Sequence, residues 1–334
     1  MITLNLINKK KSGIIYEITN FSDTQKALTI KSFSTNNSPD TIWQNTDLSK
    51  IKDKKVTIIS RMTWEDVQLI ILATTALKEL KVKEINLFVP YFLGARSDRK
   101  FNDGSSNYLK TVICPIINSL QFNEVQVIDA HSYVLEGCLN NYKGISNLSF
   151  VRECFRSLYG LSESRKNNNF ILLSPDAGAS HKIFQIAKDL DATNRVLECS
   201  KERDKNGKIV NVHVPINKSA EAIDYIIIDD ICDGGSTFIN IAKKIKEIQE
   251  TQSYKSKIYL ICTHGIFSKG FSELSKYVDK IFTTNSCGTL HSNIQSGKNT
   301  LIDSWIGQTE EHYFEEIPKD LITQIDITKC YYKY

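Results

Sequence analysis

Hydrophobic and polar residues alternate along the chain in two patterns. Short runs rich in Ile, Val and Leu are typical of buried strands, and stretches with apolar residues every three to four positions are typical of amphipathic helices. The strand-like runs are 56–60, 85–90, 125–129, 170–173, 195–199, 225–228 and 257–262. Because helical stretches separate them, the pattern predicts an α/β protein with mainly parallel sheets.

The helical stretches lie between these runs. Thr63 is a candidate N-cap for the first, whose predicted apolar face consists of Val67, Ile70, Ile71, Thr74 and Leu77. Residues 107–120 predict a helix that Pro115 kinks. Further helices are predicted around 181–190 and from Ser236, the latter with a stripe of Phe238, Ile241, Ala242, Ile245 and Ile248.

The strand and helix pattern occurs twice, which predicts two domains. A chain of 334 residues is long enough for both. The polar segment 140–147 separates them, so we expect domains at 1–146 and 147–334. The first 45 residues are strand-rich with a loop at 34–39, and the tail after about 285 has too weak a pattern to place.

Composition and charge narrow the function classes. The net charge of +4 is mild and the basic residues are spread out, whereas nucleic-acid binders usually concentrate them on one face. Eight cysteines form no CxxC pair, which favours free thiols in a reducing compartment over disulfides or zinc. Without a long apolar run or a leader, we expect a cytoplasmic protein with neither a nucleic-acid nor a membrane partner.

The strongest chemical signal is the run YIIIDDICDGGSTF at residues 225–238. Asp229 and Asp230 follow an apolar strand and can accept hydrogen bonds from two vicinal sugar hydroxyls. The glycine turn that opens the next helix suits a phosphate, because backbone N–H groups and the helix dipole favour an anion. The structural alternative is an acidic turn capped by Ser236 or Thr237, but two acids closing a buried strand are costly without a partner. The run therefore favours a ribose-phosphate ligand.

This run resembles the phosphoribosyl-pyrophosphate loop of type I phosphoribosyltransferases and of ribose-phosphate pyrophosphokinases. Further segments resemble motifs of the pyrophosphokinases: VPYFLGARSDRKF at 89–101, VIDAHS at 127–132, SPDAGA at 174–179 and THGIFS at 263–268. They keep the family's order from about residue 56 to 282. The resemblance implies two tandem phosphoribosyltransferase-like (Rossmann-like) domains, and transfer of the β,γ-diphosphate of ATP to the anomeric hydroxyl of a 5-phosphorylated ribose, with AMP released and Mg²⁺ bound to the phosphates.

The resemblance also implies roles for residues. The ribose phosphate would be bound by Asp229, Asp230, Asp233, Gly234, Gly235, Ser236 and Thr237. ATP would be bound by Arg96, Ser97, Arg99 and Phe33, and the metal by His131, Asp176 and Asp129. Lys201 and Arg203, on a mobile catalytic loop, would act together with His131. Each cation that neutralises developing phosphate charge would lower the barrier by roughly 3 kcal/mol.

Without the resemblance, these residues have plainer interpretations. A lone His131 is most often a satisfied core residue, and residues 96–100 or 199–208 would be solvated loops. Imidazole is also an unusual ligand for Mg²⁺, which prefers oxygen, so the ATP phosphates would have to supply other ligands.

Three departures from the family pattern concern the ligand ends. FSTNNSPD at 33–40 stands where the family's adenine loop has Phe-x-Asp-Gly-Glu, and Ala179 stands where a second glycine is usual. DGGST at 233–237 replaces Asp-Thr-Gly-Gly-Thr, so Gly234 removes a hydroxyl and leaves space. A phosphodiester would fit such a pocket. The chain also resembles a divergent, phage-associated branch that pyrophosphorylates ADP-ribose during NAD rebuilding, so both ribose 5-phosphate and ADP-ribose stay open as acceptors.

Two other function classes compete. A phosphoribosyltransferase would explain the 229–237 loop but neither the first α/β half nor Arg96 and His131. A non-catalytic regulatory homologue should lack the catalytic cations, whereas Lys201 and Arg203 are present. Because family members assemble as dimers and hexamers, we expect a homo-oligomer whose size, regulation and adenine contacts the sequence leaves open.

Overall fold

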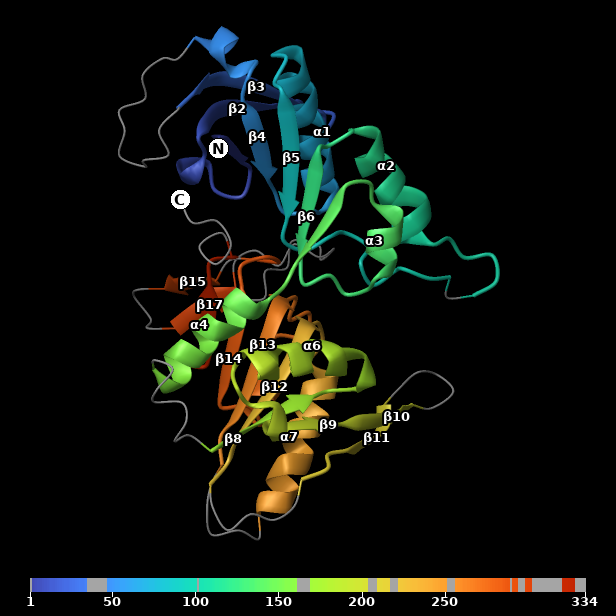
Figure 1. The fold of residues 1–334 in the computed structure, drawn as a ribbon, viewed down its shortest axis with the longest axis vertical. Helices are drawn as coiled ribbons and strands as arrows, with labels where there is room; N and C mark the ends of the chain where they lie inside the picture. Colours follow the sequence, from blue (N-terminus) through green and yellow to red (C-terminus); the bar gives the residue numbers. More distant parts are fainter. Residues whose placement is uncertain are drawn as a thin grey trace. The chain divides into compact units, whose positions relative to one another are not determined.

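The computed structural model describes residues 2–34, 47–100, 102–160, 169–203, 209–216, 222–250, 256–288, 290–293, 298–301 and 320–327. The chain divides into two compact units: unit 1 runs to Ser146 and unit 2 begins at Asn147. Each unit contains a parallel sheet flanked by helices, which confirms the predicted α/β class (Figure 1). Within the described residues, no helix combines the length and apolar character that a membrane span requires.

Unit 1 contains a parallel five-stranded sheet in the order β1-β4-β5-β6-β7. Its strands are β1 (Ile2–Asn5), β4 (Lys55–Ile59), β5 (Glu84–Val89), β6 (Glu124–Ile128) and β7 (Tyr142–Ile145), and β2 (Ile14–Asn20) pairs with β3 (Lys26–Phe33) in a hairpin. The helices are α1 (Trp64–Glu79), α2 (Cys114–Ser119) and α3 (Val134–Cys138), with short 3-10 turns at Lys9–Lys11 and Leu48–Ile51. Every connection steps to the next strand in the same direction, so right-handed crossovers place all of them on one face.

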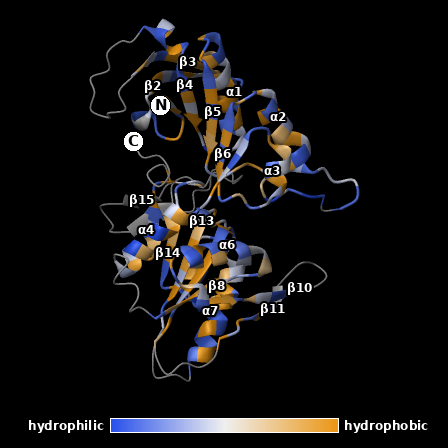
Figure 2. Ribbon diagram, viewed as in Figure 1, coloured by the Kyte–Doolittle hydropathy of each residue, from blue (hydrophilic) through white to orange (hydrophobic). Residues whose placement is uncertain are grey.

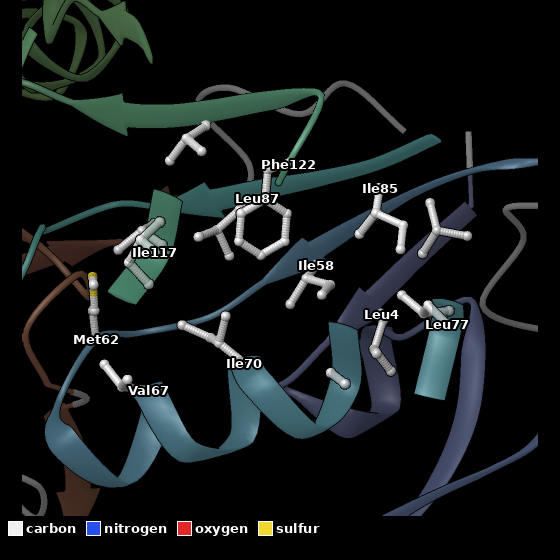
Figure 3. Packing of buried hydrophobic residues seen from close by; sticks show 14 of the residues in the cluster. Leu4, Ile58, Met62, Val67, Ile70, Leu77, Ile85, Leu87, Ile117 and Phe122 are labelled. Atoms are coloured by element: carbon white, nitrogen blue, oxygen red, sulfur yellow. The ribbon is translucent and has the colours of Figure 1, made fainter. Parts of the chain in front are cut away.

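The core of unit 1 lies between this face and its helices. Figure 3 shows Ile58 and Leu87 of the sheet facing Val67 and Ile70 of α1. The predicted cap is confirmed: Thr63 Oγ1 accepts from the Asp66 N–H at 3.1 Å, and Asp66 Oδ2 accepts from the Thr63 N–H at 2.9 Å. This reciprocal capping box fixes the start of α1.

One expectation for unit 1 was wrong in detail: Ile71, assigned to the apolar face of α1, is exposed. The helix predicted over 107–120 is present as a π-helix at Leu109–Ile113 that continues directly into α2, and Pro115 lies at the start of α2. The polar segment predicted to separate the domains contains β7, the edge strand of the sheet, and unit 2 begins at its last residue.

Unit 2 contains a parallel six-stranded sheet in the order β17-β14-β13-β12-β8-β9. These strands are β8 (Phe170–Ser174), β9 (Val196–Glu198), β12 (Asp224–Cys232), β13 (Ile258–Gly265), β14 (Lys280–Thr284) and β17 (Ile322–Ile325). The helices are α4 (Leu148–Tyr159), α6 (Ala177–Asp189), α7 (Ser236–Gln249) and α8 (Ser272–Ser275), with a 3-10 turn at Thr193–Arg195. Two antiparallel pairs complete the unit: β10 (Ser200–Arg203) with β11 (Ile209–His213), and β15 (Leu290–Asn293) with β16 (Lys298–Leu301).

The sheet of unit 2 is covered on both faces. One core cluster joins α4 and α6 to the sheet, and a second joins α7 and α8 to it. Figure 2 shows the hydrophobic positions concentrated on the strands that these helices cover. From β8 the chain passes through α6 to β9, whereas from β12 it passes through α7 to β13 on the other side. The carboxyl ends of β8 and β12 therefore lie at a topological switch point, the usual ligand position in such sheets.

Two expectations for unit 2 need correction. The strand expected to end at Ile228 continues to Cys232, because Asp229, Ile231 and Cys232 pair with β13. The loop expected at 199–208 begins as strand β10, which pairs with β11. The thiols are as expected for the described residues: seven cysteines are free, and six of them are buried.

Candidate active site

Asp229 and Asp230 lie at the carboxyl end of β12. Pairing with β8 stops at Ile227, so both acids lie beyond the last β8 partner while the backbone still pairs with β13. Asp229 Oδ1 accepts from the Asp230 N–H at 2.9 Å, and Asp230 is only 6% exposed. The two carboxyl groups are thus held side by side at the switch point.

The two acids have unequal surroundings. Burial, together with the charge of Asp230, raises the pKa of the Asp229 carboxyl well above its ordinary value. Lys182 of α6 places its Nζ 3.6 Å from Asp230 Oδ2 and so opposes the charge of that acid. A protonated Asp229 can donate a hydrogen bond to one hydroxyl, and the carboxyl oxygens of both acids can accept from vicinal hydroxyls.

The turn after β12 leads into the N-terminus of α7. Gly235 has φ +75°, which favours glycine, and it is the N-cap of α7. The N-cap makes no side-chain hydrogen bond to this helix, which counts against the alternative of an acidic turn capped by Ser236 or Thr237. The uncapped N–H groups of the first turn, together with the helix dipole, suit a phosphate.

The turn after β8 contains Asp176, which binds the cation Lys201 near Asp229. Asp176 is the N-cap of α6, with Oδ1 accepting from the Ala179 N–H at 3.2 Å. Its other carboxylate oxygen forms an ion pair with Lys201 of β10. The charge of Asp176 also contributes to the raised pKa of Asp229. Lys201, Asp176 and Asp229 therefore belong to one cluster; the side chain of Arg203, at the end of β10, is outside the described part.

Three of the four predicted ATP residues, Arg96, Ser97 and Arg99, lie in the loop after β5. Arg96 and Arg99 are exposed in the loop after β5, where the Ser97 N–H donates to the Gly94 carbonyl at 2.8 Å. Asn107 Nδ2 fixes the far side of this loop by donating to the Asp98 carbonyl at 2.8 Å. The two arginines are thus exposed to solvent and follow the carboxyl end of β5.

Asp129 and His131 follow β6. Asp129 is 6% exposed with φ +45°, whereas His131 is exposed. His131 belongs to unit 1 and Asp176 to unit 2. Among the residues that the structure describes, no three His, Cys, Asp or Glu side chains converge as a metal site would need. A Mg²⁺ ion here fits only with phosphate and water oxygens as most of its ligands, which is its usual preference.

Comparisons with known proteins agree with this geometry. No family model matches the chain. A ribose-phosphate pyrophosphokinase of Thermococcus kodakarensis is 26% identical over 232 residues, which are 69% of this chain and 76% of the relative. One from Pyrococcus furiosus is 28% identical over 246 residues, 72% of this chain and 81% of the relative. The chain is thus similar to ribose-phosphate pyrophosphokinases over about two thirds or more of its length.

A solved structure has the same fold. The crystal structure of phosphoribosylpyrophosphate synthetase from Mycobacterium smegmatis superposes with a TM-score of 0.66 at 13% identity, covering 95% of this chain and 87% of that one. The match covers 95% of this chain, so both units share the fold of that protein although few residues are identical.

Two departures from the pyrophosphokinase pattern have a structural explanation. Ala179, in place of the second glycine, is buried in the core beneath α6, where its methyl group packs. Phe33, predicted to contact adenine, is wholly buried in the core at the end of β3. A ring in that position cannot stack on a nucleobase without leaving the core, so its burial argues against the predicted contact; residues 35–40 lie outside the described part.

Sequence reasoning missed two lysines next to the acceptor loop. Lys182 comes just after the SPDAGA motif and faces Asp230. Lys269 comes directly after THGIFS, and its side-chain carbons lie 3.3 to 3.6 Å from where a Cβ on Gly234 would be. Their positions beside two motifs were the available signal, but the contacts depend on how separate loops meet.

Proposed function

We propose that the protein is an ATP-dependent diphosphotransferase that acts on a ribose carrying a 5-phosphate. The anomeric hydroxyl oxygen forms a bond to the β-phosphorus of ATP and loses its proton. The bond from that phosphorus to the oxygen bridging the α-phosphate breaks, and AMP leaves with that oxygen. One observation carries the proposal: the Asp229–Asp230 pair and the uncapped start of α7 share a switch point with Lys201.

The acceptor would be bound mainly by unit 2. Asp229 and Asp230 would bind the vicinal hydroxyls, and the stretch from Asp233 to Thr237 would bind the 5-phosphate. A carboxylate pair cannot serve a nonpolar ligand at this depth, because its desolvation needs hydrogen-bond partners. Support for this assignment comes from the unequal environments of the two acids.

The ATP phosphates would be met by cations. The exposed Arg96 and Arg99 and the partly exposed Ser97 would supply donors from unit 1, and His131 follows the next strand. Lys201 would leave its ion pair with Asp176 to neutralise charge on the transferred group, with Arg203 beside it on β10. Asp176, Asp129 and His131 would hold Mg²⁺ through phosphate and water, and the ion when bound neutralises the triphosphate.

Two acceptors fit this chemistry. The relatives are named for ribose phosphate, which supports ribose 5-phosphate. Gly234, where the family has threonine, supports ADP-ribose, because it lets the Lys269 side chain lie beside the phosphate side of the site. The same anomeric hydroxyl is available in both molecules, and we favour ADP-ribose because of this change.

Mass spectrometry of the products tests the proposal. Purified protein is incubated with ATP, Mg²⁺ and each acceptor in turn. An acceptor that is used gains about 160 mass units, two phosphoryl groups, while AMP accumulates. If neither acceptor gains that mass, the proposed activity is wrong. AMP formation with an acceptor and no nucleobase present also excludes a phosphoribosyltransferase.

A further inference from the structure

The loop after β13 is attached firmly to the acceptor site. The N–H groups of Ile266 and Phe267 both donate to the Cys232 carbonyl, at 2.8 and 3.1 Å, so the loop is bonded to the end of β12. Phe267 and Phe271 pack their rings 4.5 Å apart, and the Gly270 N–H donates to the Phe267 carbonyl at 2.8 Å. The loop is therefore a compact block with a fixed position beside Asp233.

Lys269 is the cation that this block presents. Ser268 donates to the Asp233 carboxylate, which places the next residue over the glycine turn. The Cγ, Cδ and Cε atoms of Lys269 lie 3.6, 3.3 and 3.4 Å from an ideal Cβ on Gly234. Its aliphatic stem thus uses the space left by the missing side chain.

Among the described residues, the ammonium group of Lys269 has no ion-pair partner. Within the described stretches of the chain, no carboxylate or carbonyl takes an ion pair or a hydrogen bond from it. The nearby acid, Asp233, is engaged by Ser268. A flexible cation without a partner, beside a site for one phosphate, can bind another anionic group attached to that phosphate.

We propose that Lys269 determines specificity by binding the second phosphate of an acceptor whose 5-phosphate is part of a diphosphate. This inference rests on the proposed function. The start of α7 would bind the first phosphate, and Lys269, reaching across Gly234, would bind the next. A side chain at 234 would crowd the lysine stem, because its Cβ would lie only 3.3 Å from Cδ of Lys269. Ribose 5-phosphate has no second phosphate and would gain little from this lysine.

Calorimetric titration of ADP-ribose and of ribose 5-phosphate into the parent protein and four variants tests this. Lys269→Met is expected to weaken ADP-ribose binding about tenfold or more and ribose 5-phosphate binding less than threefold. Lys269→Arg, which keeps the charge, should restore most of the ADP-ribose affinity. Gly234→Thr should act in the same direction as Lys269→Met, because its Cβ displaces the lysine stem.

Lys276→Met is the matched control. Lys276 lies on the same connection and is exposed, with only Glu273 as its ion-pair partner, so its loss changes the net charge equally without touching the loop. Both affinities should stay within twofold of the parent. Thermal unfolding of every variant reports whether each is folded.

Failure of ADP-ribose to bind the parent, or an unchanged affinity of Lys269→Met for ADP-ribose, would overturn the inference. An equal loss of affinity for ADP-ribose and ribose 5-phosphate would also overturn it, because Lys269 would then bind the first phosphate. A turnover assay distinguishes failure of this inference from failure of the proposed function. Absence of AMP formation with either acceptor refutes the proposed activity, whereas the calorimetric difference between the two ligands does not require turnover.

Discussion

The two sheets are built from the same strand-helix pattern but are wound differently. In unit 1, every crossover steps in one direction, so its helices cover one face and no strand order reverses. In unit 2, the chain leaves β8 and β12 in opposite directions, and helices cover both faces. The cluster of Asp176, Lys201, Asp229 and Asp230 occurs at that reversal.

This difference shows where the sheet can stabilise charged side chains that are removed from water. At a reversal, two helices start on opposite faces beside adjacent strand ends, so their N–H groups can offset buried acids and a bound anion. Unit 1 has no such point, and its candidate residues Arg96 and His131 are exposed instead. We therefore expect the buried acids of unit 2 to select the acceptor, and the exposed cations of unit 1 to bind the phosphates of ATP.

The largest effect should come from the cation at the reversal. Lys201→Met removes the ammonium that pairs with Asp176. Its loss should lower kcat about 100- to 1000-fold, because the charge developing on the transferred group is no longer neutralised. Steady-state AMP release measures this. Lys188→Met, on the exposed side of α6, is the control, and a Lys201 variant within twofold of the parent would contradict the assigned role.

Asp229→Asn should change two measurable quantities: the catalytic efficiency and the pH dependence of folding stability. Losing a carboxyl that binds a ribose hydroxyl should lower kcat/KM about 10- to 100-fold. The raised pKa of Asp229 predicts a second effect. In the parent, the folded protein holds this proton above pH 3.8, where the unfolded chain releases it, so stability falls as pH rises towards the folded pKa.

Asparagine does not titrate, so the variant should gain stability relative to the parent as the pH rises. Urea unfolding midpoints at pH 4 and pH 8 measure the difference. Equal offsets at the two pH values would show that Asp229 ionises normally, and the asymmetric acid pair would then be wrong.

Backbone space differs between the units at two glycines. A Cβ on Gly265, at the end of β13, would lie 2.2 Å from the Phe267 ring, whereas a Cβ on Gly137 of α3 would meet nothing within 4 Å. Gly265→Ala should therefore destabilise by about 2 kcal/mol through overpacking. Gly137→Ala should be neutral or stabilise by about 0.5 kcal/mol, because alanine favours helix. Denaturant midpoints compare the two, and equal effects would refute the tight packing under the acceptor loop.

The smallest effect tests the role given to unit 1. Arg96→Gln should raise KM for ATP about tenfold while leaving acceptor affinity unchanged, because one charge-assisted contact to phosphate is lost. Arg156→Gln, on the exposed side of α4, is the control. An equal rise in KM for the acceptor would contradict the assignment of ATP to unit 1 and of the acceptor to unit 2.

Most of the fold was predictable because its elements bury periodic apolar residues. The strand end at Asp229 and Asp230 was not, since polar residues closing an apolar run look like a loop. Their backbone is nonetheless fixed by pairing of Asp229 with Cys262 and of Ile231 with His264 on β13. The β10–β11 hairpin was missed for a related reason: its charged residues have no apolar alternation, and cross-strand hydrogen bonds define it.

The candidate site was predictable only in part. Asp176 and the 229–237 loop were found from residue types and resemblance. Sequence could not show that Asp176 caps α6 while pairing with Lys201, nor that Phe33 is buried. The contact between Lys269 and Gly234 could not be predicted from the sequence either, because residues that meet through loop packing have no fixed separation along the chain.

The most direct test of the central claim is ³¹P NMR of one reaction with ATP, Mg²⁺ and acceptor. The account predicts that ATP signals are replaced by AMP and by a diphosphate on the acceptor in equal amounts, with no ADP and no free phosphate. Transfer of the β- and γ-phosphates as one unit is what the switch-point site of unit 2 is proposed to perform. Formation of ADP, or AMP released without the acceptor, would contradict it.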